Sequence, residues 1–301
     1  MAETGARACR GRAVEGRDRG GATVSGQTTS SDGEHGAREE AGNRETGPRQ
    51  EPAPREQVGR RLRWQPTPIH DDELLLSVVI PVFNEETTLE AIVERVRTVD
   101  LPKEILLVDD GSTDASPEIL AQLEAIEGVR VFRHDRNRGK GAALKTGFAE
   151  AKGNVVIIQD ADMEYDPHDY PALLRPILEG RADVVYGSRF LVREYARVHL
   201  FSHYLGNRFL TFLSNVFTGL NLTDMETCYK VFRAEVVKDL DLKSRRFNVE
   251  PEMTAKVAKK RLRVYEVPVS YAGRDFDEGK KISWRDGFSA IWAIVKYRFV
   301  N

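Results

Sequence analysis

The chain has 301 residues, of which 41% are hydrophobic and 31% are charged, a composition typical of one large or two small folded domains. Its formal net charge is -2, so the bulk charge gives no reason to expect a nucleic-acid partner. Only Cys9 and Cys228 occur, which argues against a disulfide framework or a cysteine-based zinc site and favours a reducing, cytoplasmic setting.

The N-terminal segment is polar throughout. Residues 1–63 contain no Phe, Tyr, Trp or Ile and a single Leu, Leu62. Such a segment buries too little apolar surface to offset the entropy of ordering, so we predict a disordered tail over residues 1–70, followed by one domain over residues 71–301. There is no apolar signal-peptide core, and the longest uncharged run has 15 residues, fewer than the roughly 20 that span a bilayer. We therefore expect no transmembrane helix.

From about Leu74 onward, apolar runs rich in β-branched residues alternate with helical patterns. Strands are predicted at residues 74–83, 104–110, 129–134, 154–162 and 182–189, and helices after Glu85, near residues 116–126, after Gly141 and after Pro167. This alternation predicts a Rossmann-like, doubly wound, mostly parallel α/β sheet. Ligands of such sheets bind beyond the carboxyl ends of the strands.

The second half of the sequence changes character. One helical face is predicted within residues 203–220, formed by Leu205, Phe209, Phe212, Leu213, Val216, Phe217 and Leu220. Strands at residues 228–233 and 263–271 and helices near residues 251–260 and through Trp292 complete the pattern. We interpret this half as part of the same domain.

Four carboxylates follow the predicted strand in "VVIIQDADMEYDP", namely Asp160, Asp162, Glu164 and Asp166. Two ionised carboxylates about 4 Å apart repel by roughly 4 kcal/mol at an effective dielectric near 20, so the cluster needs a cation or a proton. With oxygen donors alone, the expected metal is Mg²⁺ or Mn²⁺, held by Asp162 and Glu164. Asp166, which precedes Pro167, is predicted to be a helix N-cap.

Two further loops contain polar residues. In "DDGSTDAS" we assign Asp114 to capping the next helix and Asp110 to ligand binding. The stretch "RNRGKGAALKTG" lacks the spacing of a phosphate loop, and we interpret it as a helix start.

Five phrases in this order, "VVIPVFNEE", "EILLVDDGSTDAS", "IIQDADMEYDP", "GSRF" and "VPVSYAGRDFDEGKK", resemble the family-two inverting glycosyltransferases of GT-A fold over about residues 74–301. Within that family, "LTDMETCYKVFR" and the pair Arg274 and Lys280 are similar to dolichyl- and polyprenyl-phosphate hexosyltransferases. The resemblance implies a GT-A domain whose second half faces the acceptor. It also implies transfer of mannose or glucose from GDP-mannose or UDP-glucose to a polyprenyl or dolichyl phosphate, with inversion; the choice of donor stays open.

The resemblance also implies site residues. Those expected to contact the nucleotide sugar are Pro81, Phe83, Glu85, Val108, Asp110, Asp160, Ala161, Asp162 and Arg189. Those expected to act in catalysis are Asp162, Arg189, Arg274 and Lys280, with the three cations facing the donor diphosphate and the acceptor phosphate. At the position of Glu164, the second expected metal ligand, mannose synthases often have Gln.

The nature of the acceptor decides whether a base is needed. A phosphate monoester has a second pKa of about 6, so it is ionised near neutral pH and needs no general base. A hydroxyl acceptor must lose a proton, and Asp224 is then the nearest candidate base. A transferase with a soluble hydroxyl acceptor and a non-catalytic nucleotide-sugar-binding module remain alternatives, whereas a processive synthase is disfavoured because membrane spans and a Q-x-x-R-W motif are absent from the sequence.

A polyprenyl acceptor resides in the bilayer, so a chain without a membrane span must approach the membrane surface from the cytoplasm as a peripheral protein. The helix at residues 205–220 and the C-terminal stretch "FSAIWAIVKYRF" are the candidates for this contact. The alternative is that both helices bury these apolar faces in the core.

Overall fold

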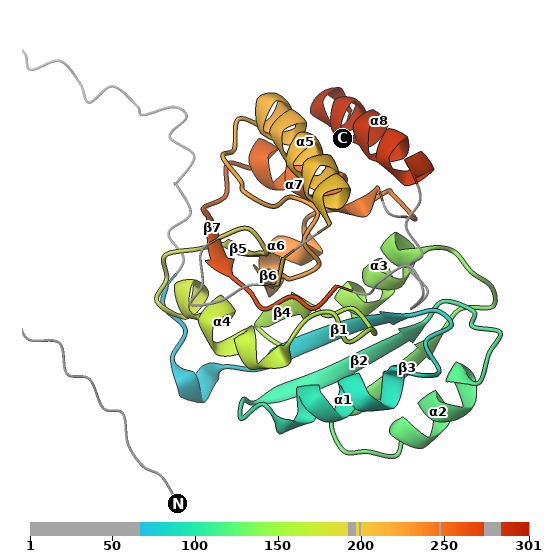
Figure 1. Ribbon diagram of the computed structural model, residues 1–301. Helices are drawn as coiled ribbons and strands as arrows, with labels where there is room; N and C mark the ends of the chain where they lie inside the picture. Colours follow the sequence, from blue (N-terminus) through green and yellow to red (C-terminus); the bar gives the residue numbers. More distant parts are fainter. Residues whose placement is uncertain (1–66, 192–196, 199, 247, 274–283, 301) are drawn as a thin grey trace, which may run out of the picture. The chain divides into compact units, whose positions relative to one another are not determined.

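The structure is a computed structural model that describes residues 67–191, 197, 198, 200–246, 248–273 and 284–300 (Figure 1). The predicted tail therefore lies outside the described residues, except for its last four positions. Arg274 and Lys280, two of the predicted catalytic cations, also lie outside them.

Seven strands form one mixed sheet. They are β1 (Leu76–Val82), β2 (Lys103–Asp109), β3 (Val129–Arg133), β4 (Val155–Ile158), β5 (Val184–Ser188), β6 (Lys230–Arg233) and β7 (Val264–Pro268). Their order across the sheet is β3-β2-β1-β4-β6-β5-β7, and β6 alone among these strands runs antiparallel to its neighbours. The predicted doubly wound, mostly parallel α/β sheet is thus confirmed.

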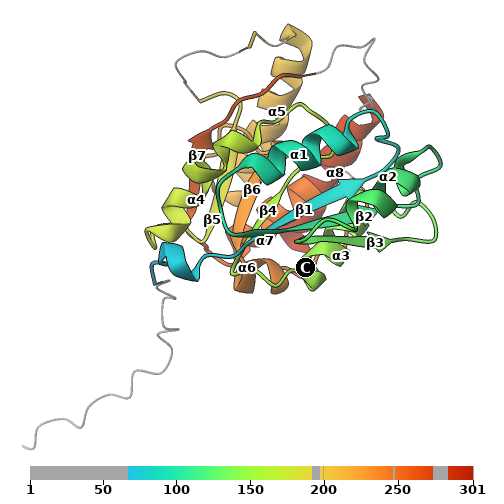
Figure 2. The same cartoon turned by 90° about the horizontal axis from the view of Figure 1, so that it is seen from below.

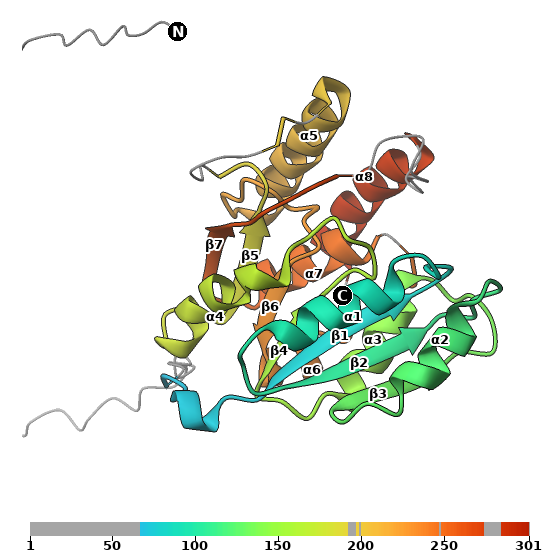
Figure 3. The same ribbon diagram turned by 60° about the horizontal axis from the view of Figure 1, so that its bottom comes forward.

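Helices connect the strands where the apolar periodicity predicts them. They are α1 (Leu89–Thr98), α2 (Ser116–Leu123), α3 (Lys140–Glu150), α4 (Tyr170–Leu178), α5 (Phe201–Thr218), α6 (Ala234–Lys238), α7 (Val249–Lys259) and α8 (Trp284–Phe299), with short 3₁₀ turns at Asp71–Glu73 and Pro167–Asp169. The sequence analysis missed only α6, which is too short for a periodic pattern. Figures 2 and 3 show α1 and α3 on opposite faces of the sheet.

The core is formed by the sheet and the apolar faces of its helices. All residues of β4 are buried, and α1 buries Leu89, Ile92, Val93 and Val96, the spacing of one helical face. Strands covered on both faces have no polar side to alternate, which explains their continuous apolar sequences. Gly147 of α3 lies against Val79 of β1 with no room for a Cβ atom, so this helix packs close to the sheet.

Helices α5, α7 and α8 pack against one another beyond the sheet (Figure 1). The predicted apolar stripe of α5 is divided between two environments. Leu213, Phe217 and Leu220 pack on the core, whereas the exposed members are Leu205, Phe209, Phe212 and Val216. On the neighbouring α8, Phe288, Trp292 and Phe299 are also exposed. Within the described ranges, no helix is long and apolar enough to cross a membrane.

Candidate active site

The candidate site lies at the carboxyl ends of β1, β2 and β4, where the strand order reverses. From β1 the chain leads to β2 on one side, and β4 pairs with β1 on the other. Such a reversal opens a crevice between the loops that follow the two neighbouring strands. Most residues predicted to contact the donor lie at this edge, where Pro81 and Val108 are register partners.

The loops after β1 and β2 are joined by hydrogen bonds. Asn84 has a left-handed backbone with φ of 54°, and its side-chain oxygen accepts from the amide of Thr113 at 2.8 Å. Asp114 accepts from the amides of Glu86 at 3.1 Å and of Ser116, the first residue of α2, at 3.0 Å. Asp114 therefore ties the start of α2 to the loop after β1, but the predicted capping position is wrong by one residue, because the N-cap of α2 is Ala115.

Asp110, directly after β2, fixes the loop that leads into α3. Its carboxylate accepts from the amides of Arg138 at 3.0 Å and Gly139 at 2.6 Å, and lies 2.7 Å from Nδ1 of His134. Gly139 has a φ of 96°, which favours glycine, and a Cβ atom there would overlap the carbonyl of Arg245. The contact of Asp110 with the nucleotide stays a prediction. The hydrogen bonds of Asp110 to the amides of Arg138 and Gly139 fix the loop directly before Lys140.

Lys140 is a candidate site residue that the sequence analysis did not single out. Its Nζ lies 2.8 Å from Oδ1 of Asp160 and 3.1 Å from Oε1 of Glu250. Burial alone would lower the pKa of Lys140, but these two carboxylates raise it well above its ordinary value. The lysine between two glycines in "RGKG" predicted a helix start, which is confirmed at Lys140, but local sequence could not show that α7 would supply Glu250.

The predicted metal ligands share one short loop after β4. The amide of Glu164 donates to Oδ1 of Asp162 at 3.1 Å, and the hydroxyl of Tyr271 donates to Oε2 of Glu164 at 2.9 Å. Asp166 accepts from the amide of His168 at 3.1 Å, which confirms its N-cap assignment. Among the described residues no group of three or more His, Cys, Asp or Glu side chains is arranged to hold a metal ion.

Arg189 follows β5 and is fixed by Asp224. Its Nε and Nη2 donate to the two carboxylate oxygens of Asp224 at 2.7 and 2.8 Å. The Arg189 side chain is 10% exposed and that of Asp224 is 0% exposed. Burial alone would lower the pKa of Arg189, but the Asp224 carboxylate raises it well above its ordinary value. Both oxygens of Asp224 are thus engaged with Arg189, which does not fit the alternative role of a general base.

Tyr271 connects the two halves of this arrangement. Its hydroxyl contacts Glu164, and the guanidinium carbon of Arg189 lies 5.1 Å from the centre of its ring. Tyr271 therefore brings together the loop that carries the predicted metal ligands and Arg189, which is the one predicted catalytic cation among the described residues. Gly273, two residues after Tyr271, directly precedes Arg274 in the sequence.

Three buried side-chain oxygens in the described part of the chain have no hydrogen-bond partner, and they belong to Glu226, Thr227 and Glu250. Burial, with the nearby Glu250 carboxylate, raises the pKa of Glu226 to about 7. Unpaired buried oxygens are costly, so native structures retain them mainly where a ligand or a function uses them. Glu226 and Glu250 are site candidates that the sequence analysis did not single out.

The raised pKa of Glu226 predicts a pH-dependent stability. The folded state holds this proton more tightly than the unfolded chain, so the contribution of Glu226 to stability is greatest below about pH 4.5 and is lost as the pH rises through about 7. Relative to Glu226→Gln, the free energy of unfolding of the unmodified protein should fall by about 1 kcal/mol per pH unit across that window. Denaturant unfolding in the presence of a chelator measures this, with the exposed Glu127→Gln as the control that should follow the unmodified protein. Parallel pH profiles for all three proteins would contradict it.

Comparisons with known proteins identify the family of this chain. The family model for glycosyl transferase family 2 matches residues 77–241. An uncharacterised protein of Methanocaldococcus jannaschii is 30% identical over 244 residues, covering 79% of this chain and 98% of that protein. The dodecaprenyl-phosphate galacturonate synthase of Rhizobium johnstonii is 30% identical over 213 residues, covering 69% of this chain and 62% of the synthase. This chain thus spans less than two thirds of the synthase.

A solved structure shows the same fold. Glucosyl-3-phosphoglycerate synthase of Mycobacterium tuberculosis, in complex with phosphoglyceric acid, superposes with a TM-score of 0.59 at 23% identity, covering 77% of this chain and 82% of that one. Another structure of that synthase contains Mn²⁺ and UDP and has a TM-score of 0.57 at 20% identity. The predicted GT-A fold is confirmed. Since the family model covers more than half of the chain, and one relative is matched over nearly its whole length, the chain belongs to glycosyl transferase family 2.

Proposed function

We propose that this glycosyltransferase moves a hexose, mannose or glucose, from a nucleotide sugar to a polyprenyl or dolichyl phosphate, with inversion at the anomeric carbon. The observation that carries the proposal is the placement of the buried Arg189 beside Tyr271, which in turn contacts Glu164. A fixed cation near the two carboxylates that are predicted to bind a metal suits a reaction in which one phosphate leaves and another attacks. Arg also offers the planar geometry that phosphates favour.

The residues present fit a hard divalent cation. Asp162 and Glu164 offer carboxylate oxygens alone, and the bond from the Glu164 amide to Asp162 keeps the two residues in one compact loop. Mg²⁺ and Mn²⁺ accept such donors, and they commonly complete their coordination with water and phosphate oxygens. A bound Mg²⁺ or Mn²⁺ would stabilise negative charge on the departing nucleoside diphosphate. In the proposal, Asp162 and Glu164 hold this ion.

The protein's own cations complete the charge balance. Arg189 is held in advance by Asp224, so little reorganisation is needed when charge develops on the leaving group. We assign Arg274 and Lys280 to the donor diphosphate and the acceptor phosphate. Lys140, paired with Asp160, keeps that carboxylate ionised at the donor side of the site, because it lowers the pKa of Asp160 against the effect of burial.

With a phosphate acceptor the reaction needs no general base, so Asp224 can serve as the partner of Arg189. The acceptor is already ionised near neutral pH, so an oxygen of the phosphate attacks the anomeric carbon as the bond to the diphosphate breaks. No proton needs to be removed. The relative from Rhizobium johnstonii is named for a dodecaprenyl-phosphate product, which supports a lipid phosphate here.

Exposed apolar side chains on the packed helices α5 and α8, together called the apolar face, support an acceptor at a membrane surface. We define this apolar face by its exposed residues, Leu205, Phe209, Phe212 and Val216 of α5 and Phe288, Trp292 and Phe299 of α8. Exposed large apolar side chains that cluster on neighbouring helices are typical of interaction sites. In the proposal this face contacts the bilayer in which the polyprenyl chain resides.

A donor panel tests the proposal. The purified protein is incubated with GDP-mannose, UDP-glucose and related nucleotide sugars, with and without polyprenyl phosphate, and with Mg²⁺, Mn²⁺ or a chelator. We expect transfer of mannose or glucose to the lipid, dependent on the metal. Donor hydrolysis without transfer to lipid under every condition, or transfer only to soluble hydroxyl compounds, would contradict the lipid-phosphate acceptor. Failure to bind any donor would favour a non-catalytic module.

A further inference from the structure

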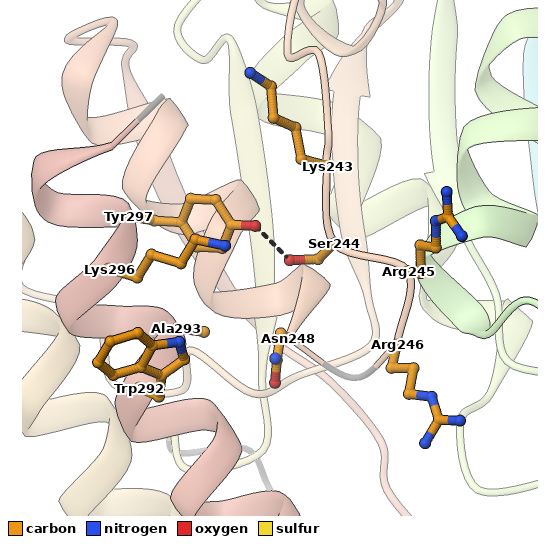
Figure 4. Close-up of a pocket in the computed structure, with 9 residues that line it drawn as sticks. All are labelled: Lys243, Ser244, Arg245, Arg246, Asn248, Trp292, Ala293, Lys296 and Tyr297. Atoms are coloured by element: carbon orange, nitrogen blue, oxygen red, sulfur yellow. Dashed lines mark hydrogen bonds between the residues drawn. The ribbon is translucent and has the colours of Figure 1, made fainter.

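A cavity of about 310 Å³ lies between α8 and the loop that leads into α7. None of the residues assigned above to the donor, the metal or the acceptor lines it. Figure 4 shows that α8 contributes Trp292, Lys296 and Tyr297, while the loop contributes Arg245 and Arg246. This basic pocket, as we call it, is therefore a second candidate site.

All charged residues that line the basic pocket are positive. Its charged lining residues are Lys243, Arg245, Arg246 and Lys296, with no carboxylate among the lining residues. Within the described part of the chain, neither arginine forms an ion pair, and the one carboxylate near Lys243 is 3.9 Å away on the exposed Asp241. Cations gathered without counter-charges repel one another, so the arrangement favours an anionic ligand.

The walls of the basic pocket are held in place. Glu252 of α7 accepts from the amides of Lys243 at 2.7 Å and Ser244 at 2.6 Å, which fixes the loop. The hydroxyl groups of Ser244 and Tyr297 are 2.9 Å apart and join the loop to α8 (Figure 4). The cationic side chains of the loop are exposed, so they can turn toward a ligand while the backbone stays fixed.

We propose that the cations of the basic pocket bind the phosphates of neighbouring anionic phospholipid headgroups at a membrane surface. Trp292 is 66% exposed and belongs both to the pocket lining and to the apolar face, so the two surfaces are continuous. Tryptophan favours the headgroup level of a membrane, and cations beside an apolar face attract anionic lipids. The charged ends of Lys243, Arg245 and Arg246 point in different directions in Figure 4 and do not converge on one point, which suits a layer of headgroups better than a single free phosphate.

This inference rests on the proposed membrane contact but not on the identity of donor or acceptor. The test is vesicle flotation without any substrate, using phosphatidylcholine alone and phosphatidylcholine mixed with phosphatidylglycerol. We expect tighter binding to the anionic vesicles, and an approximately fivefold loss of that affinity for each cation removed in the double variant Arg245→Gln/Arg246→Gln. Binding to neutral vesicles should not change, because the apolar face is intact.

The matched control is Arg175→Gln/Arg181→Gln, which removes the same charge from exposed side chains paired with Glu179 at the end of α4. It should bind anionic vesicles like the unmodified protein. An equal loss in both double variants, or no preference for anionic vesicles, would overturn the proposal. The proposal would also be overturned if soluble glycerol phosphate raised the melting temperature of the unmodified protein in a saturable way but did not raise that of the pocket variant, since this would indicate a soluble ligand.

Two further measurements separate this inference from the proposed function. Thermal unfolding establishes that both double variants are folded. Transfer to a detergent-solubilised acceptor should be equal in the unmodified protein and the pocket variant, and a loss of transfer there would place the pocket in the active site and refute the lipid role. A protein that binds anionic vesicles as expected but transfers no hexose would end the proposed function and leave the headgroup site standing.

Discussion

Replacing Asp162 by asparagine is expected to lower the rate of hexose transfer by about a thousandfold, with little change in folding. The substitution keeps the side-chain shape but removes the charge that would bind a divalent cation, and that cation is worth several kcal/mol to the charge on the leaving diphosphate. Initial rates over a range of Mn²⁺ concentrations measure the effect. Binding of Mn²⁺ in the presence of the nucleoside diphosphate, followed without turnover, should weaken in parallel.

Asp166→Asn is the matched control, because the same change is made four positions along the same loop. Asp166 accepts from the amide of His168 as an N-cap, so its replacement should cost no more than about 1 kcal/mol of stability and should leave transfer intact. Metal-independent transfer by the unmodified protein, or full activity of Asp162→Asn, would refute the metal-binding role.

The second large effect is expected at Asp224, which holds Arg189. Asp224→Ala leaves a buried guanidinium without its counter-charge, and the loss of one partner of a buried pair typically costs about 3 to 5 kcal/mol. We expect Asp224→Asn, which keeps the shape, to lower both the free energy of unfolding and kcat, because Arg189 loses its fixed orientation. Chemical unfolding and steady-state kinetics with a saturating donor measure the two effects.

Asp183 offers the comparison within the same chain. It is also buried and contacts Arg263 at 3.0 Å, but it lies just before β5, whereas Arg189 lies just after the strand. Asp183→Asn should therefore lower stability without lowering kcat. If both variants lost kcat equally, the loss would reflect general destabilisation, and the positioning role of Asp224 would be wrong.

Local sequence predicted most of the architecture because each strand and most helices carry their own signal. The continuous apolar strands and amphipathic helices appeared where expected, and Asp166 occupies its capping position, whereas the N-cap of α2 is Ala115 and not the predicted Asp114. The division of α5 into a buried and an exposed face was not predictable in the same way. It depends on how α7 and α8 pack against α5, and a helical periodicity indicates that a face is apolar without indicating what covers it.

The site was predicted in part. Motifs after individual strands identified the loops, but Lys140, Glu226 and Glu250 come from segments whose proximity only the tertiary structure shows. Lys140 meets Glu250 across more than a hundred residues, and the two glycines beside it gave no hint of an ion pair. Asp224 was considered only as the nearest candidate base for a hydroxyl acceptor, and its pairing with Arg189 was not foreseen because the two residues are 35 positions apart in the sequence.

The antiparallel strand β6 has a consequence for the order in which the protein is made. It fills the position between β4 and β5, although both of those strands precede it in the chain. Until β6 has been synthesised, one edge of β4 has no neighbouring strand. The residues of β4 are apolar and become buried only in the folded protein, and an unpaired edge of this kind is prone to pair with other chains. Glu226 lies four residues before β6, so this one residue of the candidate site takes its place in the same folding step that covers the edge.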